Sequence, residues 1–203
     1  MKTTILTIAI LLTAVLGINQ STFAASFNSN EVSTILPVTS PISKIEVHGN
    51  VELYVSSGNT NQVKVYNTYY AENALIQDDK GLLRISSYNE QKLIVWVTVT
   101  DLRNLEVYDT ASVKSFGKLS AIDLDVKLYN NAFANLDLDA YHAEITLSDH
   151  AKANVSGDIQ EGNMKYDLSA SLNTSDLVSA QLIKTLNAKG AITDGDSAEL
   201  VIL

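Results

Sequence analysis

The sequence predicts an all-β fold: a right-handed, single-stranded parallel β-helix of the pectin-lyase type, with a more open, strand-rich N-terminal part. Two observations predict it. Apolar and polar residues alternate at period two along most of the chain, which is typical of half-buried strands. In addition, one nine-residue template recurs, reading apolar, any, apolar, any, Asp or Asn, any, Ala, any, apolar. Its copies occupy residues 105–113, 126–134, 145–153 and 192–200, with a fainter copy at 166–172.

The spacing of the copies favours stacked repeats. The fifth positions are Asp109, Asn130, Asp149, Ala170 and Asp196, separated by 21, 19, 21 and 26 residues. A recurrence near 20 residues is typical of solenoids, in which neighbouring units bury their apolar faces against each other. A β-sandwich is the alternative, because strand counts alone do not separate the two folds.

The fifth position of the template predicts a corner. Strict alternation would bury Asp109 beside Val107 and Ala111, and a bare carboxylate in an apolar stack is costly. Asp and Asn instead suit a bend, because they bond to nearby backbone and tolerate left-handed geometry. We therefore expect a structural corner ladder, made of Asp109, Asn130, Asp149 and Asp196.

The start of the chain predicts export. Lys2 precedes an apolar run over residues 5–18, and small residues at 21–25 offer a cleavage site. We interpret residues 1–25 as a secretory signal peptide rather than a membrane span. The protein is then exported, and is periplasmic, attached to the cell surface or secreted. Cysteine is absent, which excludes disulfides.

One domain is expected after the signal. Residues 26–40 predict a flexible lead-in, and residues 41–203 a single β-helix domain with its repeats from about residue 93. Residues 45–55 alternate cleanly, and shorter strands follow. Residues 93–99, which include Trp96, are apolar on both faces and predict a central, buried strand.

Charge narrows the range of partners. The formal net charge is −9, and removal of Lys2 with the signal makes it one unit more negative. An acidic exported chain is a poor ligand for nucleic acid. The apolar end at residues 200–203 has no obvious polar cap, so a homo-oligomer is also predicted.

Four aspartates form the candidate metal or acid–base set: Asp123, Asp125, Asp137 and Asp139. They alternate on two neighbouring segments, so their side chains share the solvent face. Opposed carboxylates bind Ca²⁺ or act as an acid–base pair. An acidic face that keeps the protein soluble and blocks edge-to-edge stacking is the alternative interpretation, and the one we favour. The three histidines show no tight metal spacing.

Two tyrosines form the candidate ligand-binding set. Tyr108 and Tyr129 each precede a corner residue, so they should stack on the outside of the fold. A tyrosine ring has an apolar face and a polar tip, which suits sugar or protein binding. Ordinary cross-strand packing explains the same pattern equally well. For Trp96, packing is the preferred interpretation.

These features resemble a known family. Residues 45–53, a glycine turn, Leu82-Leu-Arg-Ile85 and the repeated strand–polar–Ala units resemble the putative auto-transporter adhesin, head GIN domain family of exported Bacteroidetes proteins. The resemblance implies a pectin-lyase-like β-helix and adhesion at the cell surface. It brings no catalytic residues. In that family the corners usually carry Gly-Ser, whereas here they carry Asp or Asn.

The sequence therefore predicts a non-enzymatic exported binding protein that adheres to carbohydrate or protein at the cell surface. No cofactor is required, with Ca²⁺ as the candidate metal. Two alternatives stay open. One is a carbohydrate-active enzyme with paired carboxylates near residues 123–139, and the other is a structural envelope protein that contacts another protein.

Overall fold

The computed structural model describes residues 33–38, 40–66, 74–187 and 200–202; for the last of these ranges it describes only the backbone. The predicted signal peptide and the predicted corner residue Asp196 therefore lie outside the described residues. The described residues hold strands and no helix, which confirms the all-β prediction.

Fifteen strands are present in the described part of the chain. They are β1 (Ser33–Leu36), β2 (Lys44–Gly49), β3 (Val51–Ser57), β4 (Gln62–Tyr66), β5 (Ala74–Asp79), β6 (Leu82–Ser87), β7 (Leu93–Val99), β8 (Asn104–Val107), β9 (Ser112–Ser115), β10 (Leu119–Leu128), β11 (Phe133–Leu147), β12 (Lys152–Asp167), β13 (Ser171–Asn173), β14 (Leu177–Asn187) and β15 (Leu200–Ile202). β1 falls within the predicted lead-in, so residues 33–36 are a strand rather than a free linker.

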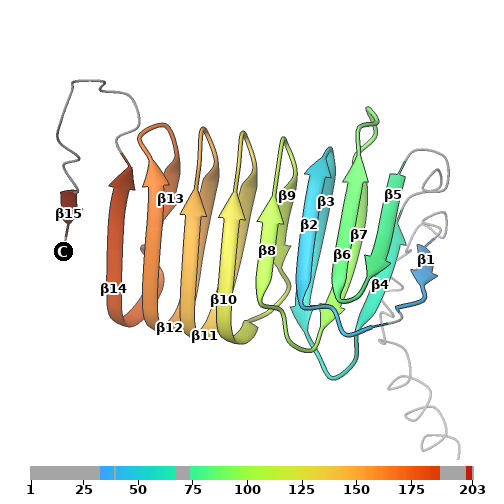
Figure 1. Cartoon of the computed structure of the whole chain (residues 1–203), viewed down its shortest axis with the longest axis horizontal. Coiled ribbons are helices and arrows are strands. Elements are labelled where there is room, and N and C mark those ends of the chain that lie inside the picture. The colour runs from blue at the N-terminus through green and yellow to red at the C-terminus, as the bar shows by residue number, and fades with distance from the viewer. Residues whose placement is uncertain (1–32, 39, 67–73, 188–199, 203) are drawn as a thin grey trace, which may run out of the picture. The chain divides into compact units, whose positions relative to one another are not determined.

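All fifteen strands belong to one curled sheet. Along one wall, β6, β2, β8, β10, β11, β12 and β14 lie side by side and parallel (Figure 1). Along the other wall, β7, β3, β9, β11 and β12 are parallel neighbours. The walls join within the long strands, because residues 133–135 of β11 pair with β9 while residues 138–147 pair with β10.

The prediction of a right-handed parallel β-helix is wrong. The sheet is mixed and curls into a half-barrel, with four antiparallel pairs: β1–β4, β4–β7, β5–β6 and β14–β15. Period-two alternation is the same in parallel and antiparallel strands, so it could not reveal these pairs. Nor could it reveal that β2 inserts between β6 and β8, out of chain order. The alternative, a sandwich of two separate sheets, is also excluded, because all fifteen described strands belong to one sheet.

The core lies between the two walls and follows the alternation. In β2 and β8, for example, Ile45, Val47, Leu105 and Val107 are fully buried, while the residues between them face outward. β7 follows the same rule: its odd-numbered residues are buried and its even-numbered residues are only half-buried. The prediction that residues 93–99 are buried on both faces is therefore wrong, and Trp96 lies on the outer face.

The C-terminal end of the sheet is partly covered. β15 pairs antiparallel with residues 184–186 of β14. Residues 200–202 belong to the apolar end from which self-association is predicted. Their backbone extends the sheet of their own chain. Within the described residues, no helix has the length and apolar character needed to cross a bilayer.

Candidate binding surfaces

The corner residues form a hydrogen-bonded ladder. Asp109, Asn130 and Asp149 have φ values of 61°, 59° and 59°, the left-handed conformation that Asp and Asn tolerate best after glycine. The amides of Gly49, Asp109 and Asn130 donate to the side chains of Asp109, Asn130 and Asp149, at 3.0, 3.2 and 3.1 Å. The Asp149 amide in turn donates to Asp167 Oδ2 at 3.1 Å. Each side chain thus satisfies the backbone of the preceding corner.

The fourth corner differs from the sequence alignment. Lys152 pairs with Ser171, which places Ala170 in the position of Ala151 rather than of Asp149. Asp167, which the alignment did not select, supplies the ladder oxygen instead. The alignment failed because that copy is two residues out of step with the others. In that alignment no two carboxylates occupy adjacent corners, whereas the structure places Asp167 next to Asp149 in the ladder.

The predicted tyrosines lie in a stacked row, which we define as His48, Tyr108 and Tyr129. The Tyr108 ring is 4.4 Å from the His48 ring and 4.7 Å from the Tyr129 ring, with interplanar angles of 4° and 6°. Both faces of Tyr108 are therefore covered by protein. Burial raises the pKa of Tyr108, and so does the 2.7 Å hydrogen bond that its hydroxyl donates to Glu106. A ligand role for these tyrosines stays a prediction.

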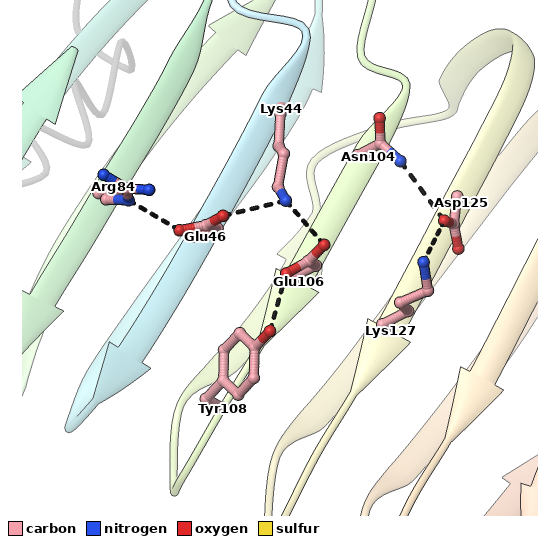
Figure 2. Close-up of polar contacts among 8 residues, drawn as sticks. All are labelled: Lys44, Glu46, Arg84, Asn104, Glu106, Tyr108, Asp125 and Lys127. Atoms are coloured by element: carbon pink, nitrogen blue, oxygen red, sulfur yellow. Dashed lines mark hydrogen bonds and ion pairs between the residues drawn. The ribbon is translucent and has the colours of Figure 1, made fainter. Parts of the chain in front are cut away.

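Paired charges run beside the stacked row (Figure 2). Arg84 Nε lies 2.9 Å from Glu46, and Lys44 Nζ bridges Glu46 at 3.0 Å and Glu106 at 2.8 Å. Partial burial raises the pKa of Glu106, but the hydrogen bonds from Lys44 and Tyr108 outweigh it, so the net pKa is lowered. Opposite charges alternate across β6, β2 and β8. Because these charged groups pair with one another, they offer little charge for a ligand to pair with.

The four predicted aspartates do not oppose one another as two pairs. Asp123 pairs in register with His142, and Asp125 with Glu144. Asp125 is held by Lys127 at 2.6 Å and by Asn104 at 3.4 Å. Among the described residues, no group of three His, Cys, Asp or Glu side chains is placed to hold a metal ion.

Two of the four line the same open groove, which has a volume of about 520 Å³. Asp123 and Asp139 line it together with Asp101 and Arg103, and Ile122, which is 73% exposed, contributes an apolar wall. Arg103 binds Asp101 Oδ2 through two guanidinium nitrogens, at 3.0 and 2.8 Å. The groove therefore combines polar and charged groups in a volume typical of small-ligand sites.

An aromatic cluster, which we define as Tyr54, Tyr66, Trp96 and Phe116, covers the outer face of the other wall. The rings of Tyr54 and Trp96 stack at 4.6 Å, Phe116 lies 5.1 Å from Trp96, and Tyr66 meets Trp96 edge-on at 6.3 Å. Phe116 is 63% exposed. The sequence analysis favoured packing for Trp96, whereas a strict in–out reading of residues 93–99 would have turned its side chain outward.

Charged residues flank the aromatic cluster. Lys114 Nζ lies 2.6 Å from Glu52 Oε1 and 5.5 Å from the centre of the Tyr54 ring, and Lys92 lies 3.8 Å from Glu52. Glu52 also accepts a 2.8 Å hydrogen bond from the Tyr54 hydroxyl. The hydrogen bond from Lys114, followed by that from Tyr54, lowers the pKa of Glu52. The cluster thus has an apolar centre and a charged rim, as interaction surfaces often do.

The structure defines a strand-rich, all-β protein: one curled, mixed sheet with aromatic side chains on its outer face. The chain belongs to the family described as putative auto-transporter adhesin, head GIN domain, whose model matches residues 41–200. This confirms the resemblance found in the sequence. Adhesins are surface-located binding proteins, so the family supports an exported or surface protein with a non-enzymatic binding role.

Solved structures show the same fold at low sequence identity. A putative adhesin from Parabacteroides merdae has a TM-score of 0.63 and 10% identity, and the similarity covers 78% of each chain. A putative lipid binding protein from Parabacteroides distasonis has a TM-score of 0.60 and 11% identity, over 78% of this chain and 79% of that one. A putative adhesin from the same species has a TM-score of 0.58 and 15% identity, over 76% and 77%. No curated protein matches the chain.

Proposed function

We propose that the chain is an exported, non-enzymatic adhesion protein that binds carbohydrate at the cell surface through the aromatic cluster. The observation that carries the proposal is the exposed Phe116 ring beside the Tyr54–Trp96 stack. The predicted signal at residues 1–25 and the family of the chain support export and adhesion.

The chemistry of the cluster suits a sugar. A pyranose presents an apolar face of C–H groups and an equatorial rim of hydroxyls, and aromatic rings with polar tips complement both. Exposed apolar patches with a polar rim mark interaction sites on soluble proteins. Here Phe116 and Trp96 supply the apolar surface, while Glu52, Lys114 and the Tyr54 hydroxyl supply the rim.

A glycan array tests the proposal. The purified exported chain is applied with calcium and with chelator, beside Phe116→Ala, Trp96→Ala and, as a matched aromatic control, Tyr129→Ala. We expect binding that is indifferent to calcium, lost in the two cluster variants and retained in the control. Binding that needs calcium, or that survives both cluster variants, would contradict this location of the site.

The groove supports a second candidate, a carbohydrate-active enzyme. Asp123 and Asp139 line the same groove, as an acid–base pair would require. Incubation with plant and bacterial polysaccharides, followed by assays for new reducing ends and unsaturated products, tests for turnover. Product that disappears in both Asp123→Asn and Asp139→Asn would favour the enzyme over the adhesin.

The oligomeric state belongs to the same proposal. A homo-oligomer would multiply weak single-site affinity by avidity, as an adhesin needs. Light scattering after size exclusion measures it directly. A monomer at all concentrations would remove avidity through self-association from the proposal.

A further inference from the structure

The row of residues across the aromatic cluster is positively charged, although the chain as a whole is acidic. Cross-strand register aligns Lys64 of β4 with Trp96 of β7, Trp96 with Tyr54 of β3, and Tyr54 with Lys114 of β9. Two aromatic rings are thus flanked by a lysine at each end. With strands about 4.8 Å apart, this row is roughly 14 Å long, enough for a short oligosaccharide rather than a single small ion.

The two end lysines differ in what they bind. Lys114 is committed to Glu52, at 2.6 Å, and Glu52 also receives Lys92. Lys64 makes no ion pair with any residue that the structure describes, and it lies directly across from Trp96. Lys92 and Lys114 both contact Glu52, whereas Lys64 does not, in a chain whose net charge is −9. The row therefore places a lysine that has no ion pair among the described residues beside an aromatic surface.

We propose that the aromatic cluster binds acidic glycans: a pyranose ring packs on Trp96 and Phe116 while its carboxylate pairs with Lys64. This inference rests on the proposed function and specifies its ligand class. Ring packing supplies contact area, and the charge-assisted hydrogen bond supplies selectivity for the acidic sugar.

Charge complementarity also separates this ligand from other anions. Duplex nucleic acid carries one charge per about 1.7 Å, and a chain of net charge −9 repels such a dense polyanion over most of its surface. An anionic membrane is repelled for the same reason. An acidic oligosaccharide is short and carries at most one carboxylate per ring, so it can meet the local positive row alone.

The single tryptophan makes the test direct, because Trp96 is the only one in the chain. Its fluorescence is titrated with tri-galacturonate, a glucuronate oligosaccharide and a sialyl-oligosaccharide, and with methyl esters of the same sugars, which keep the ring and lose the charge. We expect at least one free acid to change Trp96 emission and to bind at least about tenfold more tightly than its ester at low salt, as one charge-assisted hydrogen bond predicts.

Two matched lysine variants locate the charge. Lys64→Ala should weaken binding of the acid about tenfold and leave binding of the ester unchanged. Lys152, an exposed lysine of β12 on the same wall, provides the control, and Lys152→Ala should leave both affinities unchanged. Phe116→Ala should weaken both ligands, and thermal melts verify that each variant is folded.

The outcomes separate the two levels of the proposal. Equal affinity for acid and ester, with loss in Phe116→Ala, would overturn the acidic preference and leave carbohydrate binding at the cluster intact. A preference for the acid that Lys64→Ala does not reduce would also overturn the inference, because the anion then binds elsewhere. Silence with every acid and ester, confirmed by calorimetry, would overturn the inference together with carbohydrate binding by this cluster.

Discussion

The stacked row and the aromatic cluster are two sets of rings on the outer faces of the same sheet, and they differ in what the protein leaves unpaired. In the stacked row, Tyr108 lies between two rings and its hydroxyl bonds to Glu106. In the aromatic cluster, Phe116 is 63% exposed and Lys64 has no ion-pair partner among the described residues. Outward aromatic residues are thus not a binding site in themselves. The exposed Phe116 ring, and a lysine without an ion pair among the described residues, distinguish the aromatic cluster from the stacked row.

The same contrast holds for the charges. Beside the stacked row, Lys44 joins two glutamates and Arg84 extends the chain of ion pairs (Figure 2). Beside the aromatic cluster, Lys92 and Lys114 share Glu52, and Lys64 makes no ion pair with any described residue. We infer that the stacked row stabilises the sheet and that the aromatic cluster is available to a ligand. The experiments below test this division.

The largest effect is expected at the corner that follows the stacked row. Asp109→Ala forces alanine into a left-handed conformation, at about 1–2 kcal/mol, and removes the acceptor of the Gly49 amide, at about 1–3 kcal/mol. The sum is a loss of about 2–5 kcal/mol in the free energy of unfolding. Urea denaturation measures it.

Asp109→Gly separates the two causes. Glycine accepts the left-handed backbone but has no side-chain oxygen, so this variant should lose less than Asp109→Ala. Asp109→Asn keeps both features, as Asn130 does at the next corner, and should be close to wild type. Equal losses in the alanine and glycine variants would show that backbone conformation contributes nothing at this corner.

A pair of aromatic substitutions tests the division directly. Tyr108→Ala removes two stacked contacts, each worth about 0.5–1.5 kcal/mol, so unfolding should become easier by about 1–3 kcal/mol while glycan binding is unchanged. Phe116→Ala should leave the free energy of unfolding nearly unchanged, because its ring is mostly exposed, and should weaken glycan binding. Thermal melts and glycan binding are measured on both. Loss of binding in Tyr108→Ala, in a folded variant, would place the ligand on the stacked row.

Much of this molecule is accessible from sequence, but only where the physical signal is local. Alternation correctly identified the buried residues of β2, and the template marked Asp109, Asn130 and Asp149 for a role that depends on their own backbone. The antiparallel partners of β7 and β6 were not accessible, because pairing direction leaves no mark on alternation. Trp96 was misplaced because Ile94 beside it made both faces of β7 apolar. The Asp123–Asp139 groove depends on how residues 100–103 lie against the neighbouring strands β10 and β11, which spacing does not encode.

Acid should lower the stability of the fold by protonating Glu52, the carboxylate that Lys114 holds. The hydrogen bond from Lys114 lowers the pKa of Glu52 below its ordinary value of 4.5, so the unfolded chain binds more protons in acid than the folded protein. The stability that Glu52 contributes is present above pH 4.5 and is lost as the pH falls through the lower, folded pKa.

Melting temperatures between pH 7 and pH 3 check this, with Glu52→Gln as the comparison. The variant cannot titrate at this position, so its stability should fall less steeply in acid than that of wild type. Parallel curves for the two proteins would show that Glu52 has the same pKa in the folded and unfolded chain.

The smallest effect is expected at the outer end of the charge row. Arg84 is half exposed and, among the described residues, forms one ion pair, with Glu46, so Arg84→Met should cost about 0–1 kcal/mol, as exposed ion pairs do. Lys44→Met should cost more, since Lys44 bridges Glu46 and Glu106 and its loss leaves two partly buried carboxylates facing each other. Urea denaturation at low and high salt compares them. Equal costs for Arg84→Met and Lys44→Met would show that the charges act as one network. The stacked row would then depend on electrostatic pairing across β6, β2 and β8 rather than on its own ring contacts.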